Sequence, residues 1–184
     1  MKELLINLEE EGIKPEYGDL KKAHFESGYE SYEFYNAILK TAKKRLYVFG
    51  RKNRKLFSKN NTKIKKLIED GIDFKCLFLS DKSNASILKI AQENEKFSSD
   101  LEKIILGVKE RYKDNLDMFK KYDFQQLKRI IVVDDCVIFV PVTFVNGNVK
   151  HFTKTEFDLY DANDVYGMNL INDFNKVWSI AKPL

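Results

Sequence analysis

The sequence predicts one α/β domain, with a mixed sheet flanked by helices, a β-hairpin and a closing C-terminal helix. Its 184 residues fit a single domain, because domains average roughly 150 residues. An alternation of strand, helix and strand over residues 46–79 indicates a βαβ unit with parallel strands. The turn sequence Asn146-Gly147-Asn148 is typical of a β-hairpin, and a segment with helical periodicity follows it.

Two helices are predicted ahead of the βαβ unit. Residues 2–11 form a short amphipathic pattern, which Gly12 interrupts. Residues 30–44 form the second, because apolar side chains recur there at steps of three and four: Tyr32, Tyr35, Ile38, Leu39 and Ala42.

The βαβ unit begins with an apolar strand over residues 46–49. A basic loop over residues 51–61 is expected next, followed by a helix for which Thr62 is the N-cap. Gly71 ends that helix, and residues 72–79 form the second strand.

The second half of the chain is predicted to add helices, three or more strands and a terminal helix. The continuous apolar run of residues 130–133 is typical of a central strand buried on both faces. The predicted elements are, in order, helix 84–121 with a break near 97–99, strand 125–134, a turn at Asp134-Asp135, strand 136–145, a returning strand 149–153, a further strand 155–160 and helix 164–181.

Composition excludes several classes of protein and site. Two cysteines are too few for a disulfide scaffold or a four-thiolate zinc site, and two histidines exclude His-rich metal chemistry, so we expect no metal and no cofactor. Cys76 and Cys136 lie in apolar runs and are expected to be free core thiols. The acidic N-terminus does not resemble a signal peptide, and no apolar run approaches the ~20 residues of a membrane span. We therefore expect a cytoplasmic protein.

The net charge of +4 is distributed unevenly. Residues 43–66 carry eleven Lys or Arg and no Asp or Glu, whereas the rest of the chain carries 21 basic and 28 acidic residues, a net charge of −7. Such asymmetry is typical of a site for polyanions. The alternative is an ordinary solvated surface.

Four segments together resemble the phospholipase D-like superfamily. They are AILKTAKKRLYVFGRKN, IKKLIEDGIDFKCLFLSD, KRIIVVDD and FNKVWSIAKP. The resemblance covers residues 30–184 and implies a phospholipase D-like domain preceded by an N-terminal helix and extension at residues 1–29. It corresponds to one half of the double unit that forms an active site in this superfamily. A single half implies a homodimer with the site on its two-fold axis.

The family motif is His-x-Lys, four residues, then Asp, with Gly-Ser further on. Aligned on Asp134, the Lys position holds Arg129 and the His position holds Leu127, while Pro141-Val142 stands at the Gly-Ser position. In the family the His attacks a phosphodiester and the Lys stabilises the phosphoryl oxygens. The resemblance therefore implies a degenerate site that retains a cation and lacks its nucleophile.

The remaining candidates for chemistry have simpler alternatives. His151 is followed by Lys154 at a spacing that puts the two on opposite faces of a strand, so a surface role is favoured over a relocated catalytic histidine. His24 is expected to be a surface or internally satisfied residue. Asp134-Asp135 is also ordinary turn chemistry, and Arg129 is either a phosphate contact or a solvated strand end.

The basic loop is the predicted ligand site. It follows the C-terminal end of a parallel strand, where ligands bind in open α/β sheets. Aromatic residues interleave with the cations and are expected either to stack on bases or to belong to the core: Tyr47, Phe49 and Phe57. The predicted ligand-binding residues are Arg51, Lys52, Asn53, Arg54, Lys55, Lys59 and Arg129.

Three functions follow from these features. The first is a catalytically degenerate module that binds a nucleotide or nucleic acid, similar to regulatory domains near transcription factors and bacterial defence systems. The second is a phosphodiesterase or nuclease with a non-standard active site. The third is a dimerisation or scaffold domain whose partner binds the acidic C-terminal part.

Overall fold

The computed structural model describes residues 1–18, 22–26, 31–80, 94–124, 128–141 and 156–184. The helices are α1 (Lys2–Glu10), α2 (Tyr32–Thr41), α3 (Arg54–Glu69), α5 (Asn94–Arg111) and α6 (Val165–Ile180), with a 3-10 helix at Lys113–Met118. The strands are β1 (Tyr17–Gly18), β2 (Lys22–Phe25), β3 (Arg45–Phe49), β4 (Asp73–Leu79), β5 (Phe119–Tyr122), β6 (Lys128–Val133), β7 (Cys136–Pro141), β8 (Phe157–Asp161) and β9 (Lys182–Pro183).

The described strands form a single mixed sheet in the order β1-β2-β8-β7-β6-β3-β4-β5-β9. β3, β4 and β5 run parallel, whereas β6 runs antiparallel to β3 on its other side. The predicted parallel pair of the βαβ unit is therefore confirmed. The segment ahead of residue 30 adds two strands, because β2 pairs with β8 and β1 with β2.

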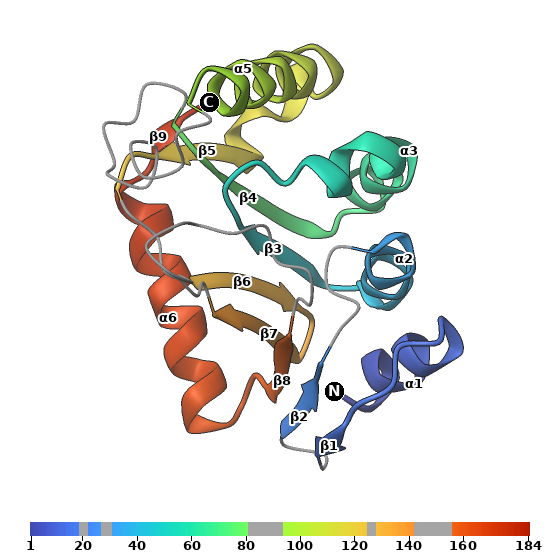
Figure 1. The fold of residues 1–184 in the computed structure, drawn as a ribbon. Helices are drawn as coiled ribbons and strands as arrows, with labels where there is room; N and C mark the ends of the chain where they lie inside the picture. Colours follow the sequence, from blue (N-terminus) through green and yellow to red (C-terminus); the bar gives the residue numbers. More distant parts are fainter. Residues whose placement is uncertain (19–21, 27–30, 81–93, 125–127, 142–155) are drawn as a thin grey trace.

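Helices cover both faces of the sheet (Figure 1). α2, α3 and α5 lie on one face, α1 packs against α2, and α6 is the one described helix that crosses the other face. Alternation along β3 explains this arrangement, because successive side chains of a strand point to opposite faces. Tyr47 and Phe49 meet Phe174 of α6, at ring-centroid distances of 5.1 and 6.4 Å. On the other face, Phe57 of α3 packs on Phe78 of β4.

The sequence prediction is wrong about where α3 begins. The helix starts at Arg54, and Thr62 lies inside it, so the expected loop over residues 51–61 is mostly helix. Lys and Arg are good helix formers, and the buried residues of α3 have helical spacing: Leu56, Phe57, Asn60, Ile64 and Ile68. The basic residues from Arg54 onward therefore stand on a helix and not in a loop.

Two further predictions in the middle of the chain are corrected. α5 runs without interruption through residues 97–99, where a break was expected. The segment read as helix to residue 121 ends instead in β5, whose Phe119 is fully buried between Phe57 and Phe74. The predicted hairpin turn at 146–148 and its returning strand lie outside the described residues.

Candidate functional site

The sheet changes direction at the point where the candidate site lies. β3, β4 and β5 end side by side at Phe49, Leu79 and Tyr122, and antiparallel β6 begins there at Lys128. We call this end of the sheet the carboxyl edge. In open α/β sheets, ligands bind outside the carboxyl ends of strands at such a switch point.

A tight turn leads from β3 to α3 at the carboxyl edge. Gly50 permits it, because a Cβ added there would lie 2.0 Å from the side-chain oxygen of Asn53. Asn53 itself has a left-handed backbone (φ 49°) and is buried. Its Nδ2 donates to the carbonyl of Leu77 at 3.0 Å and to Sγ of Cys76 at 3.3 Å. Asn53, predicted as a ligand contact, thus anchors the turn to β4 and presents no amide to solvent.

Two arginines from distant parts of the chain meet at this turn. Arg51 is half-buried just after Gly50, and its carbonyl accepts from the N–H of Leu79 at 3.0 Å. Arg129 is half-buried near the start of β6 and precedes Ile130, the register partner of Phe49, by one residue. The register therefore places Arg129 beside Gly50.

A buried tyrosine bonds to the turn that carries Arg51. The hydroxyl of Tyr122 donates to the carbonyl of Gly50 at 3.1 Å. Burial raises the pKa of the Tyr122 hydroxyl, and the positive charges of Arg51 and Arg129 act on it in the opposite direction. Guanidinium groups bind phosphate through two parallel hydrogen bonds, so this pair is suited to a phosphate group.

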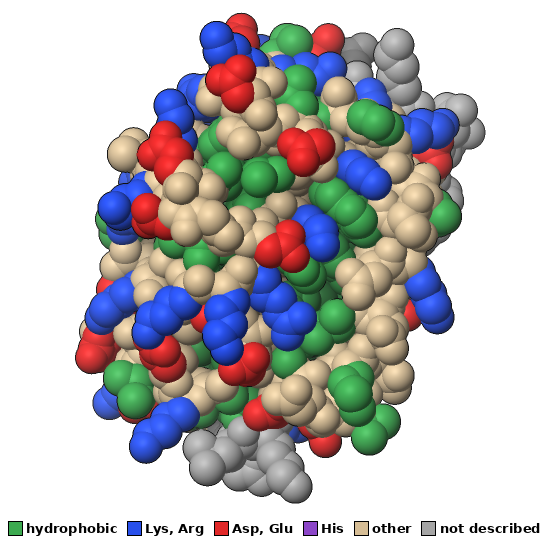
Figure 2. Space-filling model, turned by 180° about the vertical axis from the view of Figure 1, so that it is seen from behind, with side chains coloured by type: hydrophobic (Ala, Val, Ile, Leu, Met, Phe, Trp, Pro, Cys, Tyr) green, Lys and Arg blue, Asp and Glu red, His purple; other side chains and the backbone are tan. Residues whose placement is uncertain are grey.

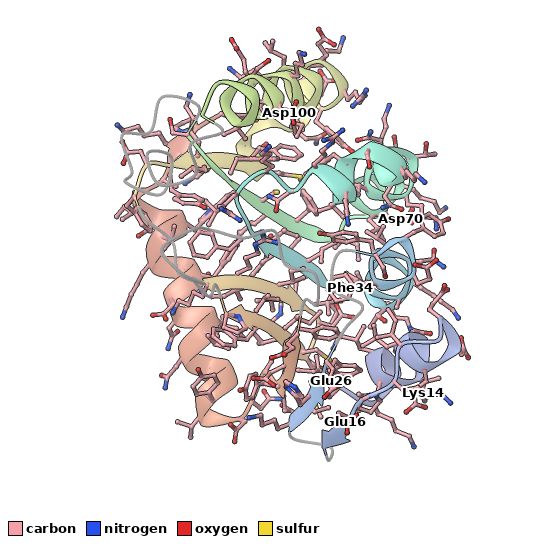
Figure 3. All side chains as sticks on the ribbon, in the orientation of Figure 1. Lys14, Glu16, Glu26, Phe34, Asp70 and Asp100 are labelled. Carbon is pink, nitrogen blue, oxygen red and sulfur yellow. The ribbon has the colours of Figure 1, made fainter. Side chains whose placement is uncertain are left out.

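Neighbouring cations share one carboxylate. Lys52 Nζ lies 3.5 Å and Arg54 Nη1 3.6 Å from Oδ2 of Asp100 on α5. Burial lowers the pKa of the Lys52 ammonium; Asp100 raises it, and the charges of Arg54 and Arg51 lower it further. Asp100 lies near the start of α3, at the opposite end from Asp70 (Figure 3). It holds the start of α3 to α5, so Lys52 and Arg54 have a structural partner.

The other predicted cations of α3 are more exposed and more dispersed. Lys55 and Lys59 stand on the outer surface of the helix, and Lys59 Nζ lies 5.9 Å from the ring centre of Tyr32. Further along, Lys65 and Lys66 form ion pairs with Glu69 and Asp70. On the face shown in Figure 2, Lys and Arg side chains are interspersed with Asp and Glu.

Asp134 lies at the opposite end of β6 from Arg129, in the β6–β7 turn. Its backbone is left-handed (φ 48°), and Oδ1 accepts from the N–H groups of Lys44 at 2.8 Å and Arg45 at 3.0 Å. Oδ2 accepts from the N–H of Lys43 at 3.0 Å. The strand separates Asp134 from Arg129 by roughly 16 Å, at ~3.3 Å per residue. The motif acid thus ties the turn to the start of β3 and takes no part in the candidate site.

The remaining histidine and lysine candidates either lie outside the described residues or bond to another element of the fold. Leu127, at the histidine position, and His151 lie outside the described residues. Lys128 bonds to Asp173 of α6.

His24 is hydrogen-bonded inside the protein, which is one of the two roles predicted for it. Its Nδ1 lies 2.8 Å from Oδ1 of Asp158, across the pairing of β2 with β8. The hydroxyl of Tyr160 donates to the other oxygen of that carboxylate at 3.1 Å.

The described residues offer no reactive thiol, metal cluster or membrane-spanning helix. Cys76 and Cys136 are free and buried, as predicted, and burial raises the pKa of both thiols. Within the described ranges, no three His, Cys, Asp or Glu side chains group in a way that suits a metal ion. The helices of the described segments are too short or too polar to cross a bilayer.

Solved structures share this architecture, although no family model and no curated protein matches the sequence. TrmBL2, an archaeal chromatin protein that binds DNA, aligns with 100% of this chain and 61% of its own, at a TM-score of 0.56 and 14% identity. Phosphatidylserine synthase from Haemophilus influenzae aligns with 89% of this chain and 40% of its own, at 0.59 and 12%. NucT from Helicobacter pylori aligns with 89% of this chain and 99% of its own, at 0.53 and 12%.

The fold is phospholipase D-like. Phosphatidylserine synthase and NucT are phospholipase D family members, so the fold class predicted from the sequence is confirmed. The chain spans about three fifths of TrmBL2 and two fifths of the synthase.

Two residues of the site were missed by sequence reasoning. Tyr122 falls between the predicted helix 84–121 and the predicted strand 125–134, because β5 is only four residues long and contains two lysines. No sequence pattern singles out Asp100, since its ion pairs with Lys52 and Arg54 depend on how α5 packs against α3. The carboxyl edge thus includes a phenol and a carboxylate that no motif spacing reveals.

Proposed function

We propose that this chain is a catalytically degenerate phospholipase D-like domain that binds a phosphate-bearing ligand, a nucleotide or nucleic acid, at the carboxyl edge. The observation that carries the proposal is the position of Arg51 and Arg129 at the carboxyl edge, where Arg51 follows Gly50 and the β3–β6 register places Arg129 beside the same glycine. Leu at position 127 supports binding without cleavage, because a leucine side chain can neither attack phosphorus nor transfer a proton. DNA binding by TrmBL2, which shares the fold over the whole chain, supports a nucleic-acid ligand.

Salt-dependent binding tests this proposal. Anisotropy of a short fluorescein-labelled single-stranded oligonucleotide is measured from low to physiological salt, where binding through phosphates weakens steeply. Arg51→Gln and Arg129→Gln are each expected to reduce affinity about tenfold. The matched control is Lys66→Gln, which removes an exposed cation at the far end of α3. Affinity that is independent of salt, or equally reduced by all three changes, contradicts the proposal.

The degenerate site is tested by turnover. We expect no hydrolysis of bis(p-nitrophenyl) phosphate by the purified chain. Hydrolysis that His151→Ala abolishes would overturn the binding-only proposal in favour of a rebuilt phosphodiesterase site.

We further propose a homodimer that acts as a regulatory or defence-related module. Support comes from coverage, because the chain aligns with 40% of phosphatidylserine synthase, as expected for one half of a double unit. Light scattering after size exclusion should give twice the chain mass of 21.6 kDa. A monomer at working concentrations contradicts the dimer.

A further inference from the structure

A pocket adjoins the carboxyl edge between the end of β5 and the end of α6. Its volume is about 90 Å³. The residues that line it are Ser80, Lys121, Tyr122, Asp123, Phe124, Ile180, Ala181 and Lys182.

The pocket and the candidate phosphate site share a wall. Tyr122 lines the pocket, and its hydroxyl reaches the carbonyl of Gly50, the residue before Arg51. The N–H of Ser80 donates to the carbonyl of Tyr122 at 2.6 Å, while that of neighbouring Leu79 donates to Arg51 at 3.0 Å. The end of β4 therefore connects the pocket wall at Tyr122 to the backbone of Arg51.

The side chains of the pocket combine apolar surface with a charged rim. Phe124 is 36% exposed and Ile180 71% exposed, although both are large and apolar. The Phe124 ring lies 5.1 Å from that of Tyr122, at an interplanar angle of 48°. On the rim, Lys182 forms an ion pair with Asp123 at 4.0 Å. An exposed aromatic ring beside cations is the combination that stacks on bases next to a phosphate backbone.

We propose that this pocket binds one unpaired nucleobase of the ligand whose phosphate lies between Arg51 and Arg129. The inference rests on the proposed function and names its ligand class. Typical small-molecule sites enclose roughly 300–1,000 Å³, so a space this small holds a ring and leaves sugar and phosphate outside. A paired base cannot enter, because stacking in a duplex covers both of its faces. The ligand is therefore a nucleotide or a single strand, and duplex DNA binds more weakly.

The experiment compares oligonucleotides that carry the same phosphates and differ in their bases. Anisotropy is measured with a labelled oligothymidylate, an abasic oligomer of the same length and a duplex. We expect oligothymidylate to bind about tenfold more tightly than the abasic oligomer. Phe124→Ala and Ile180→Ser should remove most of that advantage and leave abasic binding unchanged. The matched control is Met168→Ser, a 44% exposed residue on the opposite end of α6.

The outcomes separate this inference from the proposed function. Equal affinity for thymidylate and abasic oligomers, still reduced by Arg51→Gln, overturns the base pocket and leaves phosphate binding standing. A base advantage that survives both pocket variants also overturns it, as does a duplex bound as tightly as the single strand. Absence of binding to any oligomer overturns both proposals. Circular dichroism confirms that each variant is folded, which is expected for changes at exposed positions.

Discussion

The two ends of the β3–β6 strand pair use charged residues in opposite ways. At the start of β3, Asp134 accepts the backbone N–H groups of Lys43, Lys44 and Arg45, so this carboxylate is fully committed to the fold. At the carboxyl edge, Arg51 follows Gly50, and the strand register places Arg129 beside the same glycine. The family motif contains residues from both ends, and only the geometry shows that one end is structural. Spacing in sequence therefore identifies a strand and its turn, but not which end of it binds a ligand.

The largest expected effect comes from removing the structural carboxylate. Asp134→Ala loses hydrogen bonds to three backbone N–H groups and places alanine at φ 48°. Hydrogen bonds to charged groups contribute about 1.5–3 kcal/mol each and are not additive, so we expect a loss of about 3 kcal/mol in the free energy of unfolding. Urea denaturation measures it. Asp135→Ala, at the exposed neighbouring position of the turn, should change stability by less than about 0.5 kcal/mol. Comparable losses for the two variants would contradict the structural role of Asp134.

A smaller effect is expected from Gly50→Ala at the other end of β3. The new methyl group meets the Asn53 oxygen at 2.0 Å, so the turn that presents Arg51 must move. Overpacking of this kind costs about 1–3 kcal/mol. Because the displaced turn carries Arg51, oligonucleotide affinity should fall together with stability. Wild-type affinity in a destabilised Gly50→Ala variant would show that the position of this turn does not matter for binding.

Much of the fold was predictable because local patterns agree with the tertiary structure. The apolar runs of β3, β4 and β6 and the glycines that follow β3 and α3 locate the βαβ unit and the central strands. β5 and β9 are not predicted because they are short and contain lysines, which the sequence suggests are solvated; Lys120 instead places its Nζ 4.7 Å from the ring centre of Trp178. The start of α3 was misplaced because no side-chain cap marks it, and Asn53 closes the turn through tertiary bonds.

The candidate site was predictable only as a list of cations. Arg51 and Arg129 were identified from the end of a strand and from a motif position, and the structure brings them together. Lys55 and Lys59 were in the same list, yet they stand on the outer surface of α3. Charge content alone cannot separate these cases, because it contains no information about strand register or helix face. The register of β3 on β6 supplies that information.

Tyr122→Phe should lower stability modestly at neutral pH, and the difference from the wild-type protein should shrink at alkaline pH. The change removes the hydrogen bond to the carbonyl of Gly50, a loss of about 1 kcal/mol at neutral pH. Burial raises the pKa of Tyr122 above its ordinary value of 10.0, so the folded state keeps its phenolic proton where the unfolded state loses it. The stability due to this phenol is therefore present below pH 10 and is lost as pH rises above it. Urea unfolding from pH 7 to 11 should show a shallower alkaline decline for Tyr122→Phe, and identical slopes would contradict a buried neutral phenol.

The smallest effects are expected on the outer surface of α3. Lys66→Gln removes an exposed ion pair at 3.8 Å from Asp70, and such pairs contribute about 0–1 kcal/mol. Thermal unfolding should shift little, and oligonucleotide affinity should stay within about twofold of wild type. A larger loss of affinity would mean that binding depends on total charge and not on the carboxyl edge.

The central claim is that Arg51 and Arg129 bind the same phosphate, and a double-mutant cycle tests it most directly. Oligonucleotide affinity is measured for wild type, Arg51→Gln, Arg129→Gln and the double variant at one salt concentration. Because residues that share a partner are energetically coupled, the account predicts that the double variant deviates from additivity by at least about 0.5 kcal/mol. Additive losses would place the two guanidinium groups on separate phosphates, and wild-type affinity in either single variant would remove that residue from the site.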